Sequence, residues 1–455
     1  MAETKKQDMG TGSVKRKMVQ LAVPAVVAQV INLLYNIVDR IYIGHIPEIG
    51  AHALTGVGLF TPILMLITAF AMLAGSGGAP LAAIAMGRGE QDRAEKIMGN
   101  CFTVLLLMAV VLTGVFCAFI PELIRLFGGS GNTIPYGVSY GRIYSLGSVF
   151  VLVVMGMNPF ITTQGFAKIS MLTTVIGAVI NIILDPILIF ALDLGVAGAA
   201  IATVLSQAVS AVWILRFLTG KKTMLKLRFG NMILEPGVIL PCLGLGVSSF
   251  VMVSTESILS VSFTSSLFRY GGDVAVGAMT VLTSVNQVIS MPLVGICQGG
   301  QPLMSYNYGA GKLDRVKEAF LCQFTVCVSY ATVFWVLVQL FPSFFAGIFT
   351  NEQALVDYTA WAMRIFLAGC FSVGFQNSCQ QAFVALGQAK ISLFMACLRK
   401  LILLIPLIFI LPNFFQNKAM AVFLAEPVSD ILAAAAATTA FFLFFRRLMK
   451  SPHMQ

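Results

Sequence analysis

The sequence predicts an all-α integral membrane protein with twelve transmembrane helices, arranged as two pseudo-symmetric lobes of six helices each. Three observations support this fold class. Of the 455 residues, 58% are hydrophobic and 11% are charged, whereas soluble proteins carry about 25% charged residues. Apolar runs of about 20 residues, long enough to cross a bilayer, fill nearly the whole chain. A sequence repeat divides these runs into two equal sets.

Twelve apolar runs separated by loop signals give the individual spans. They cover about 18–44, 53–83, 97–120, 141–164, 170–192, 195–218, 237–266, 274–304, 319–341, 359–384, 391–412 and 419–444. Because the number is even, both termini lie on one side, and Lys and Arg concentrate in the loops of that side. This bias is typical of cytoplasmic loops, so we expect cytoplasmic termini in a multi-pass protein of the plasma or bacterial inner membrane.

The loop charge also accounts for the formal net charge of +10, which therefore indicates no nucleic-acid partner. The nine cysteines and three histidines form no CxxC pair and no His cluster, so we expect packing cysteines, no metal centre and no cofactor. The basic N-terminal residues lack the short apolar core of a cleaved signal peptide.

Three short motifs recur at a single offset of 222 residues. They are Gly77–Pro80 with Gly299–Pro302, Gly87–Arg93 with Gly309–Arg315, and Gly165–Ser170 with Gly387–Ser392. The offset moves each span forward by six, so the halves form a parallel repeat about an axis near the membrane normal. We therefore divide the chain into a first lobe (1–218, helices 1–6), a basic cytoplasmic linker (219–236) and a second lobe (237–455, helices 7–12).

A single carboxylate, Asp185, lies well inside the fifth apolar span. A charge in that position costs at least about 2.5–3.5 kcal/mol, so such a residue is expected to face a bundle interior and to be functional. Asn181 lies one turn earlier on the same helical face. Pro186 removes a backbone donor at the place where a cation site could use a freed carbonyl.

A polar stripe in the first span contains a second membrane carboxylate. Its members recur at helical spacing: Asn32, Tyr35, Asn36 and Asp39. With cytoplasmic termini, the depths of Asp39, Asp185 and Thr203 agree within roughly 5 Å. We predict that Asp39, Asn181, Asp185 and Thr203 meet in the outer half of the first lobe and bind a coupling ion, either a proton or a sodium ion. The alternative is that each carboxylate caps a kink or pairs structurally.

The second lobe has a different set of polar residues. Glu256 lies in the seventh span, Gln298 in the eighth, Arg399 in the eleventh, and Glu426 and Asp430 in the twelfth. An Arg beside carboxylates also forms purely structural ion pairs, so these are weaker candidates. Gln298 precedes a Gly-Gly break and is either a substrate contact or a packing residue. At the repeat offset Asp185 corresponds to Leu407, so the proposed ion chemistry belongs to the first lobe alone.

Several segments resemble the multidrug and toxic compound extrusion (MATE) transporters, most closely the MepA-like branch. They are Pro24, Asp39–Gly44, Asn181–Phe190, Gly198–Thr203 and Pro302–Tyr308. The resemblance covers nearly the whole chain and implies a V-shaped pair of six-helix lobes that exports organic cations in exchange for protons or sodium.

In related members a first-lobe cation site uses residues that match Asp39, Asn181, Asp185 and Thr203. The resemblance places Tyr35 and Asn158 nearby and a bendable first helix at Pro24. Some members instead rely on a carboxylate in the seventh span, which Glu256 resembles. The MepA-like pattern often has an acidic residue where Gln298 stands, which leaves the substrate-charge preference of the second lobe open.

The expected function is therefore a cation-coupled antiporter that exports amphipathic, mostly cationic compounds by alternating access, as a monomer in the lipid bilayer. One alternative is a lipid-linked saccharide flippase, which predicts a large cationic cavity, whereas only Arg399 and Lys400 are obvious mid-span cations. The other is a membrane-embedded enzyme, which requires a constellation such as HExxH or CxxC that the sequence does not contain.

Overall fold

The computed structural model describes residues 9–127, 129–349 and 352–450, and these residues form helices without any strand. The first half of the chain folds into α1 (Val14–Gly44), α2 (Gly50–Gly87), α3 (Gln91–Leu126), α4 (Ile134–Leu146), α5 (Ser148–Thr163), α6 (Ala167–Pro186), η1 (Ile187–Ala191) and α7 (Gly195–Leu218). A short η2 (Phe229–Asn231) follows. The second half folds into α8 (Pro236–Gly309), α9 (Leu313–Leu340), α10 (Pro342–Gly347), α11 (Gln353–Phe366), α12 (Cys370–Ala385), α13 (Ala389–Cys397), η3 (Leu398–Leu404), α14 (Ile405–Ile410), η4 (Leu411–Asn413) and α15 (Lys418–Lys450).

The described helices are consistent with the predicted twelve membrane spans. Nine of them are long and apolar enough to cross a membrane, and two further spans are bent pairs, α4 with α5 (56°) and α11 with α12 (46°). The helix α8 itself consists of two helices joined at Gly272, whose φ of 65° is readily adopted only by glycine. Counting α8 as two spans gives twelve, which confirms the fold class, a multi-pass α-helical membrane protein.

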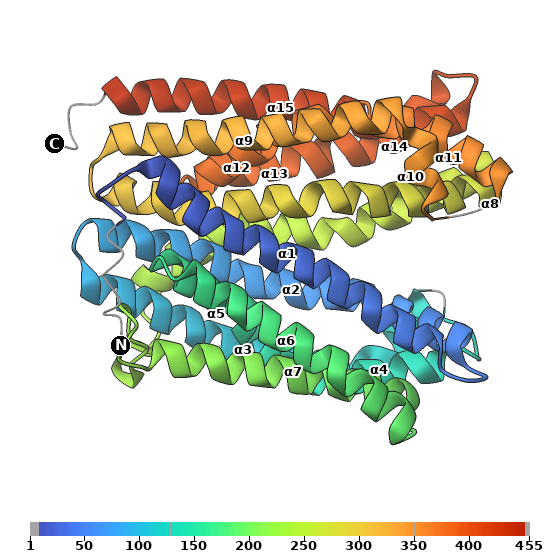
Figure 1. The fold of residues 1–455 in the computed structure, drawn as a ribbon, viewed down its shortest axis with the longest axis horizontal. Helices are drawn as coiled ribbons and strands as arrows, with labels where there is room; N and C mark the ends of the chain where they lie inside the picture. The colour runs from blue at the N-terminus through green and yellow to red at the C-terminus, as the bar shows by residue number, and fades with distance from the viewer. Residues whose placement is uncertain (1–8, 128, 350–351, 451–455) are drawn as a thin grey trace.

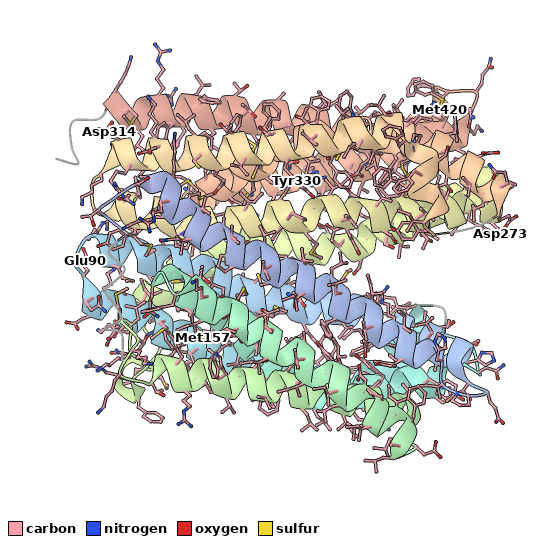
Figure 2. All side chains as sticks on the ribbon, viewed as in Figure 1. Glu90, Met157, Asp273, Asp314, Tyr330 and Met420 are labelled. Carbon is pink, nitrogen blue, oxygen red and sulfur yellow. The ribbon has the colours of Figure 1, made fainter. Side chains whose placement is uncertain are left out.

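The helices form two groups that lie close together at one end and diverge toward the other (Figure 1). The described chain begins and ends at the close end, which we call the terminal end, and the opposite end is the far end. Glu90 and Asp314 mark the terminal end, whereas Asp273 and Met420 mark the far end (Figure 2).

The first helix of each half begins inside the hydrophobic core of the other half. Val14 and Met18 of α1 pack into the core built mainly from residues 259–445. Ile239 and Cys242 of α8 pack into the core built mainly from residues 43–227. This exchange intertwines the two halves at the terminal end.

Small residues let α2 and α8 touch backbone to backbone at that end. A Cβ atom on Gly87 would lie 2.0 Å from the carbonyl oxygen of Tyr306, and a Cβ atom on Gly309 would lie 2.0 Å from that of Ile84. Side chains at either glycine would force the helices apart, so this close contact requires glycine.

Residues 219–236, between α7 and α8, are tied to the first half. Gln164 Oε1 accepts hydrogen bonds from Thr223 Oγ1 (2.8 Å) and from the backbone N–H groups of Met224 (2.7 Å) and Leu225 (2.9 Å). On α3, the buried Glu95 accepts from the N–H of Lys226 at 3.0 Å. This segment, the linker, is therefore packed against the first half.

Candidate functional site

Four of the residues that the sequence singles out come together in the first half. Asp39 lies on α1, Asn181 and Asp185 on α6, and Thr203 on α7. The Asn181 amide donates to Asp185 Oδ1 and to Thr203 Oγ1, each at 3.4 Å. The carboxyl groups of Asp39 and Asp185 lie close enough to interact electrostatically. Asn181 and Asp185 are fully buried.

The backbone changes its winding directly after Asp185. Pro186 supplies no N–H, so α6 ends there and the chain continues as a π-helix over Ile187–Ala191. Single π turns in longer helices occur frequently at functional sites. The local sequence Asp-Pro therefore places the carboxylate at a break in the regular hydrogen-bond pattern.

Three oxygens in this cluster have no hydrogen-bond donor. They are Asp39 Oδ1, Asn181 Oδ1 and Asp185 Oδ2, all shielded from solvent. A buried acceptor without a partner costs about 1–3 kcal/mol. A proton supplies a donor to one carboxylate, and a sodium ion takes oxygen ligands of this kind, so the cluster has the chemistry of a cation site.

Three tyrosines enclose the Asp39 carboxylate. Tyr35 lies on α1, while Tyr140 and Tyr144 lie one turn apart on α4 with ring centroids 6.0 Å apart. All three interact electrostatically with Asp39. Sequence reasoning missed Tyr140 and Tyr144, although two tyrosines four residues apart in an apolar span were a readable signal.

The remaining first-half candidates lie around this cluster. Pro24 lies inside the continuous helix α1. Asn36 is exposed and donates to the carbonyl of Asn32 at 2.7 Å, so its amide is satisfied within its own helix and does not join the cluster. Asn158 donates to the carbonyl of Ser170 at 3.4 Å, and its Oδ1 is buried without a partner.

A cavity of about 320 Å³ separates the two halves, and both halves line it. Its polar wall includes Gln29, Asn32, Tyr35, Asn158, Gln298 and Gln301. Gln29 of α1 donates to Gln298 Oε1 of α8 at 3.0 Å across the cavity. Among the described residues, none that lines this cavity is charged. Tyr35 belongs to both the cavity wall and the surroundings of Asp39, so it connects the two.

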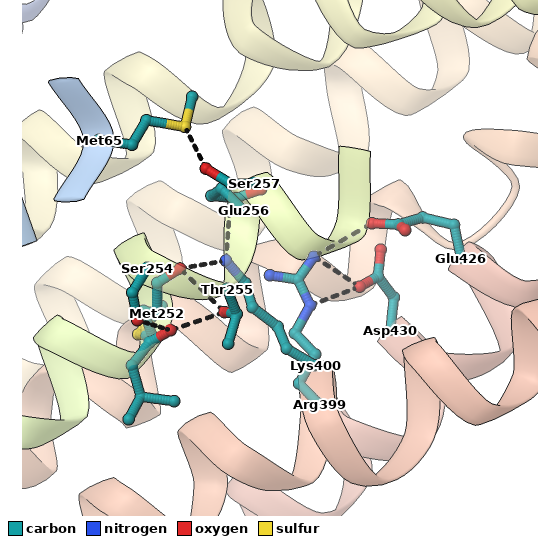
Figure 3. Close-up of polar contacts among 11 residues, drawn as sticks. Met65, Met252, Ser254, Thr255, Glu256, Ser257, Arg399, Lys400, Glu426 and Asp430 are labelled. Carbon is teal, nitrogen blue, oxygen red and sulfur yellow. Dashed lines mark hydrogen bonds and ion pairs between the residues drawn. The ribbon is translucent and has the colours of Figure 1, made fainter. Parts of the chain in front are cut away.

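A second charged cluster lies in the second half (Figure 3). On the π-helix η3, Arg399 Nη2 lies 2.7 Å from Asp430 Oδ1 and 3.5 Å from Glu426 Oε1. The next residue, Lys400, pairs with Glu256 of α8 and donates to the carbonyl of Met252 at 2.5 Å. Arg399 and Lys400 therefore fix η3 to two different helices, α15 and α8.

The two members of the Lys400–Glu256 pair differ in exposure. The Lys400 side chain is 5% exposed and that of Glu256 is 51% exposed. The adjacent Ser257 hydroxyl donates to Met65 Sδ of α2 at 3.6 Å, so this part of α8 lies against the first half (Figure 3). Of the second-half candidates, only Gln298 lines the central cavity. Met252 also lines this cavity, and because its carbonyl accepts from Lys400, the Lys400 ammonium lies next to the cavity.

A repeated helical membrane bundle with an uncharged cavity between its halves and a carboxylate cluster beside that cavity is typical of a membrane transporter. A family model described as MatE matches residues 24–187 and again 248–410, which together are more than half of the chain. The chain belongs to the MatE family of transporters and is not an enzyme.

Named relatives agree with this assignment. The chain is 24% identical over 407 residues to the multidrug export protein MepA of Staphylococcus saprophyticus, covering 89% of this chain and 88% of the relative. It is 27% identical over 371 residues to the probable multidrug resistance protein YoeA of Bacillus subtilis, covering 78% and 79%.

Solved structures share the fold. One is an outward-facing multidrug resistance MATE transporter, with a TM-score of 0.92 at 23% identity, covering 99% of this chain and 100% of that one. Another is a transporter of the same superfamily from Pyrococcus furiosus, with a TM-score of 0.91 at 22% identity and the same coverage.

Proposed function

We propose that this protein is a cation-coupled antiporter that exports amphipathic, mostly cationic organic compounds by alternating access. The observation that carries the proposal is the cluster of Asp39, Asn181 and Asp185 beside the cavity, because each of these residues presents a buried oxygen without a hydrogen-bond donor. The relatives named as a multidrug export protein and a probable multidrug resistance protein support export of multiple organic compounds. The chain acts as a monomer that carries its ion site within the first lobe, residues 1–218.

The coupling ion, a proton or a sodium ion, binds at Asp39, Asn181, Asp185 and Thr203. Two nearby carboxylates repel each other when both are ionised, so a bound cation stabilises the pair. Inward movement of one charge is worth about 2.3 kcal/mol per 100 mV, which can drive export of a substrate. Tyr35 transmits the effect of ion binding to the cavity wall. Pro24 gives α1 a point at which to bend.

The substrate occupies the central cavity. Its wall of neutral amides, methionines and small residues accepts amphipathic molecules of varied shape. The cationic preference comes from the Asp39 and Asp185 carboxylates just outside the wall, because Glu256 is already paired with Lys400. A flippase for lipid-linked saccharides would need a cationic cavity, and the described lining residues include no Lys or Arg.

Both termini face the cytoplasm in this proposal. The terminal end carries most of the Lys and Arg of the loops, as expected for a cytoplasmic side. The backbone contacts of Gly87 and Gly309 close that end. The linker, residues 219–236, runs across it between the first lobe and the second, 237–455. Cation loading from outside would then favour release of substrate outward.

Export in proteoliposomes tests this function. An imposed pH or sodium gradient should drive transport of a fluorescent cationic dye such as ethidium by the intact protein. Asp185→Asn removes one charge of the pair with little change in volume, so we expect the driven rate to fall at least tenfold, about 1.4 kcal/mol.

Asp193→Asn is the matched control. Asp193 lies just beyond η1, is exposed, and has a φ of 53°, a conformation that Asn also tolerates. Its substitution should leave the driven rate unchanged. An unchanged rate in a folded Asp185→Asn protein would refute the ion site, and transport without any gradient dependence would refute antiport.

A further inference from the structure

A second cavity opens at the terminal end of the second half, away from the central cavity. It has a volume of about 310 Å³ and lies between the start of α9 and the end of α15. Phe320 of α9 packs against Phe441 and Phe442 of α15, and α12 packs against both helices (Figure 1). The transport function proposed above makes no use of this cavity.

The apolar part of this α9–α15 cavity is mainly aromatic, with Phe320 and Phe445 buried and Leu321, Phe442 and Met449 exposed. Phe320 stacks on Phe441 with ring centroids 4.1 Å apart, and Phe441 in turn packs on Phe383 of α12 at 5.3 Å. The floor is therefore held by packing from three helices.

The outer part of the same cavity is basic. Lys317 of α9 and Arg446 and Lys450 of α15 complete the lining. Arg446 and Lys450 lie four and eight residues beyond Phe442, about 6 and 12 Å further along the helix toward its end. All three basic side chains are exposed, and among the described residues none of them forms an ion pair.

The first half fills the corresponding position with its own chain. At the repeat offset of 222, Lys317 corresponds to Glu95 of α3. Glu95 accepts from the N–H of Lys226 and pairs with Arg228 at 3.5 Å, while Leu225 and Leu227 of the same segment are buried. The second half has a cation at this position, and within the described ranges the α9–α15 cavity remains open.

We propose that the α9–α15 cavity binds one anionic phospholipid. The phosphate contacts Lys317, Arg446 and Lys450, and an acyl chain lies along the aromatic floor. Basic pockets between transmembrane helices on the cytoplasmic side recognise anionic head groups in this way. The apolar floor favours a lipid over free phosphate, because a phosphate alone would leave that floor without a partner. The inference concerns lipid binding and is independent of whether the proposed antiport is correct.

Native mass spectrometry of the full chain in detergent tests the site. Dioleoyl phosphatidylglycerol should form a one-to-one adduct, whereas dioleoyl phosphatidylcholine, with the same chains, and glycerol 3-phosphate, with no chains, should not. Each basic residue near an anionic head group contributes about fivefold. The triple variant Lys317→Gln, Arg446→Gln, Lys450→Gln should therefore weaken phosphatidylglycerol binding by about 100-fold.

Two further variants make the test decisive. A triple Gln variant at Lys168, Lys221 and Lys222 removes the same charge from exposed positions of the first half and should leave the adduct unchanged. Leu321→Trp fills the apolar part, keeps every charge and should weaken the adduct if a chain lies there. Equal binding of the two lipids, or equal losses in both triple variants, would overturn the proposal.

Discussion

Gly87 on α2 and Gly309 at the end of α8 make the same contact in opposite directions. Gly87 lies against the carbonyl of Tyr306, and Gly309 lies against the carbonyl of Ile84. Both pairs are related by the repeat offset of 222 residues, since 84 and 87 correspond to 306 and 309. The pseudo-twofold axis therefore passes between these helices, and the terminal end is closed by a symmetric backbone contact.

Substitution at one of these glycines should open the terminal end. In Gly309→Ala the new Cβ would meet the carbonyl of Ile84, so α2 and α8 must separate. We expect faster amide hydrogen exchange in peptides covering 82–88 and 304–310. Gly114→Ala is the control, because a Cβ at Gly114 in α3 meets nothing within 4 Å. Unchanged exchange in the Gly309 variant would show that this contact does not hold the end closed.

Asp39 and Asp185 should act as one unit. If each carboxylate serves the same bound cation, removing either one abolishes coupling, and removing the second costs little more. We expect Asp39→Asn, Asp185→Asn and the double variant to show driven export rates within about threefold of one another. Independent multiplicative losses in this double-mutant cycle would assign the carboxylates to separate roles.

Thr203→Val should separate proton coupling from sodium coupling. The substitution removes an oxygen that a sodium ion would use as a ligand while leaving both carboxylates in place. A sodium-coupled protein should lose at least tenfold in apparent sodium affinity, about 1.4 kcal/mol. A proton-coupled protein should keep its driven rate within about threefold, because proton binding needs no fourth oxygen. Rates measured under each gradient separately distinguish the two outcomes.

The Lys400–Glu256 pair should respond asymmetrically to substitution. Glu256→Ala leaves an ammonium group that is 5% exposed without its counter-charge, and a buried unpaired charge costs about 3–5 kcal/mol. Lys400→Met leaves a carboxylate that is 51% exposed and can be solvated, so we expect a loss of about 1 kcal/mol or less. Thermal unfolding in detergent checks the order. A larger loss for Lys400→Met would contradict the burial argument.

Gln164 should be needed to keep the linker, residues 219–236, packed against the first half. Gln164→Leu removes the acceptor of two backbone N–H groups, at a cost of about 1–3 kcal/mol for each group left buried. We expect a lower unfolding temperature and faster proteolysis within 219–236. Thr219→Val is the control, because the Thr219 hydroxyl bonds only within its own exposed helix end. Equal proteolysis in both variants would show that Gln164 does not hold the linker in place.

The sequence alone determined the number and approximate position of the spans. Each span must satisfy its backbone hydrogen bonds internally, so apolar length translates directly into helices. The isolated Asp185 and the polar stripe ending at Asp39 were equally readable, because a charge within an apolar run is costly wherever the helix packs. The repeat at 222 residues predicted two similar halves without any structural information.

Tertiary structure decided which polar side chains share a partner. The sequence offered Arg399 and Lys400 as adjacent cations, but only the packing of η3 between α15 and α8 sends Arg399 to Asp430 and Lys400 to Glu256. The roles of Tyr140 and the exposure of Asn36 likewise depend on how α4 and α1 rotate against their neighbours. Helical periodicity defines a face, whereas the partner of that face is set by long-range packing that no local pattern encodes.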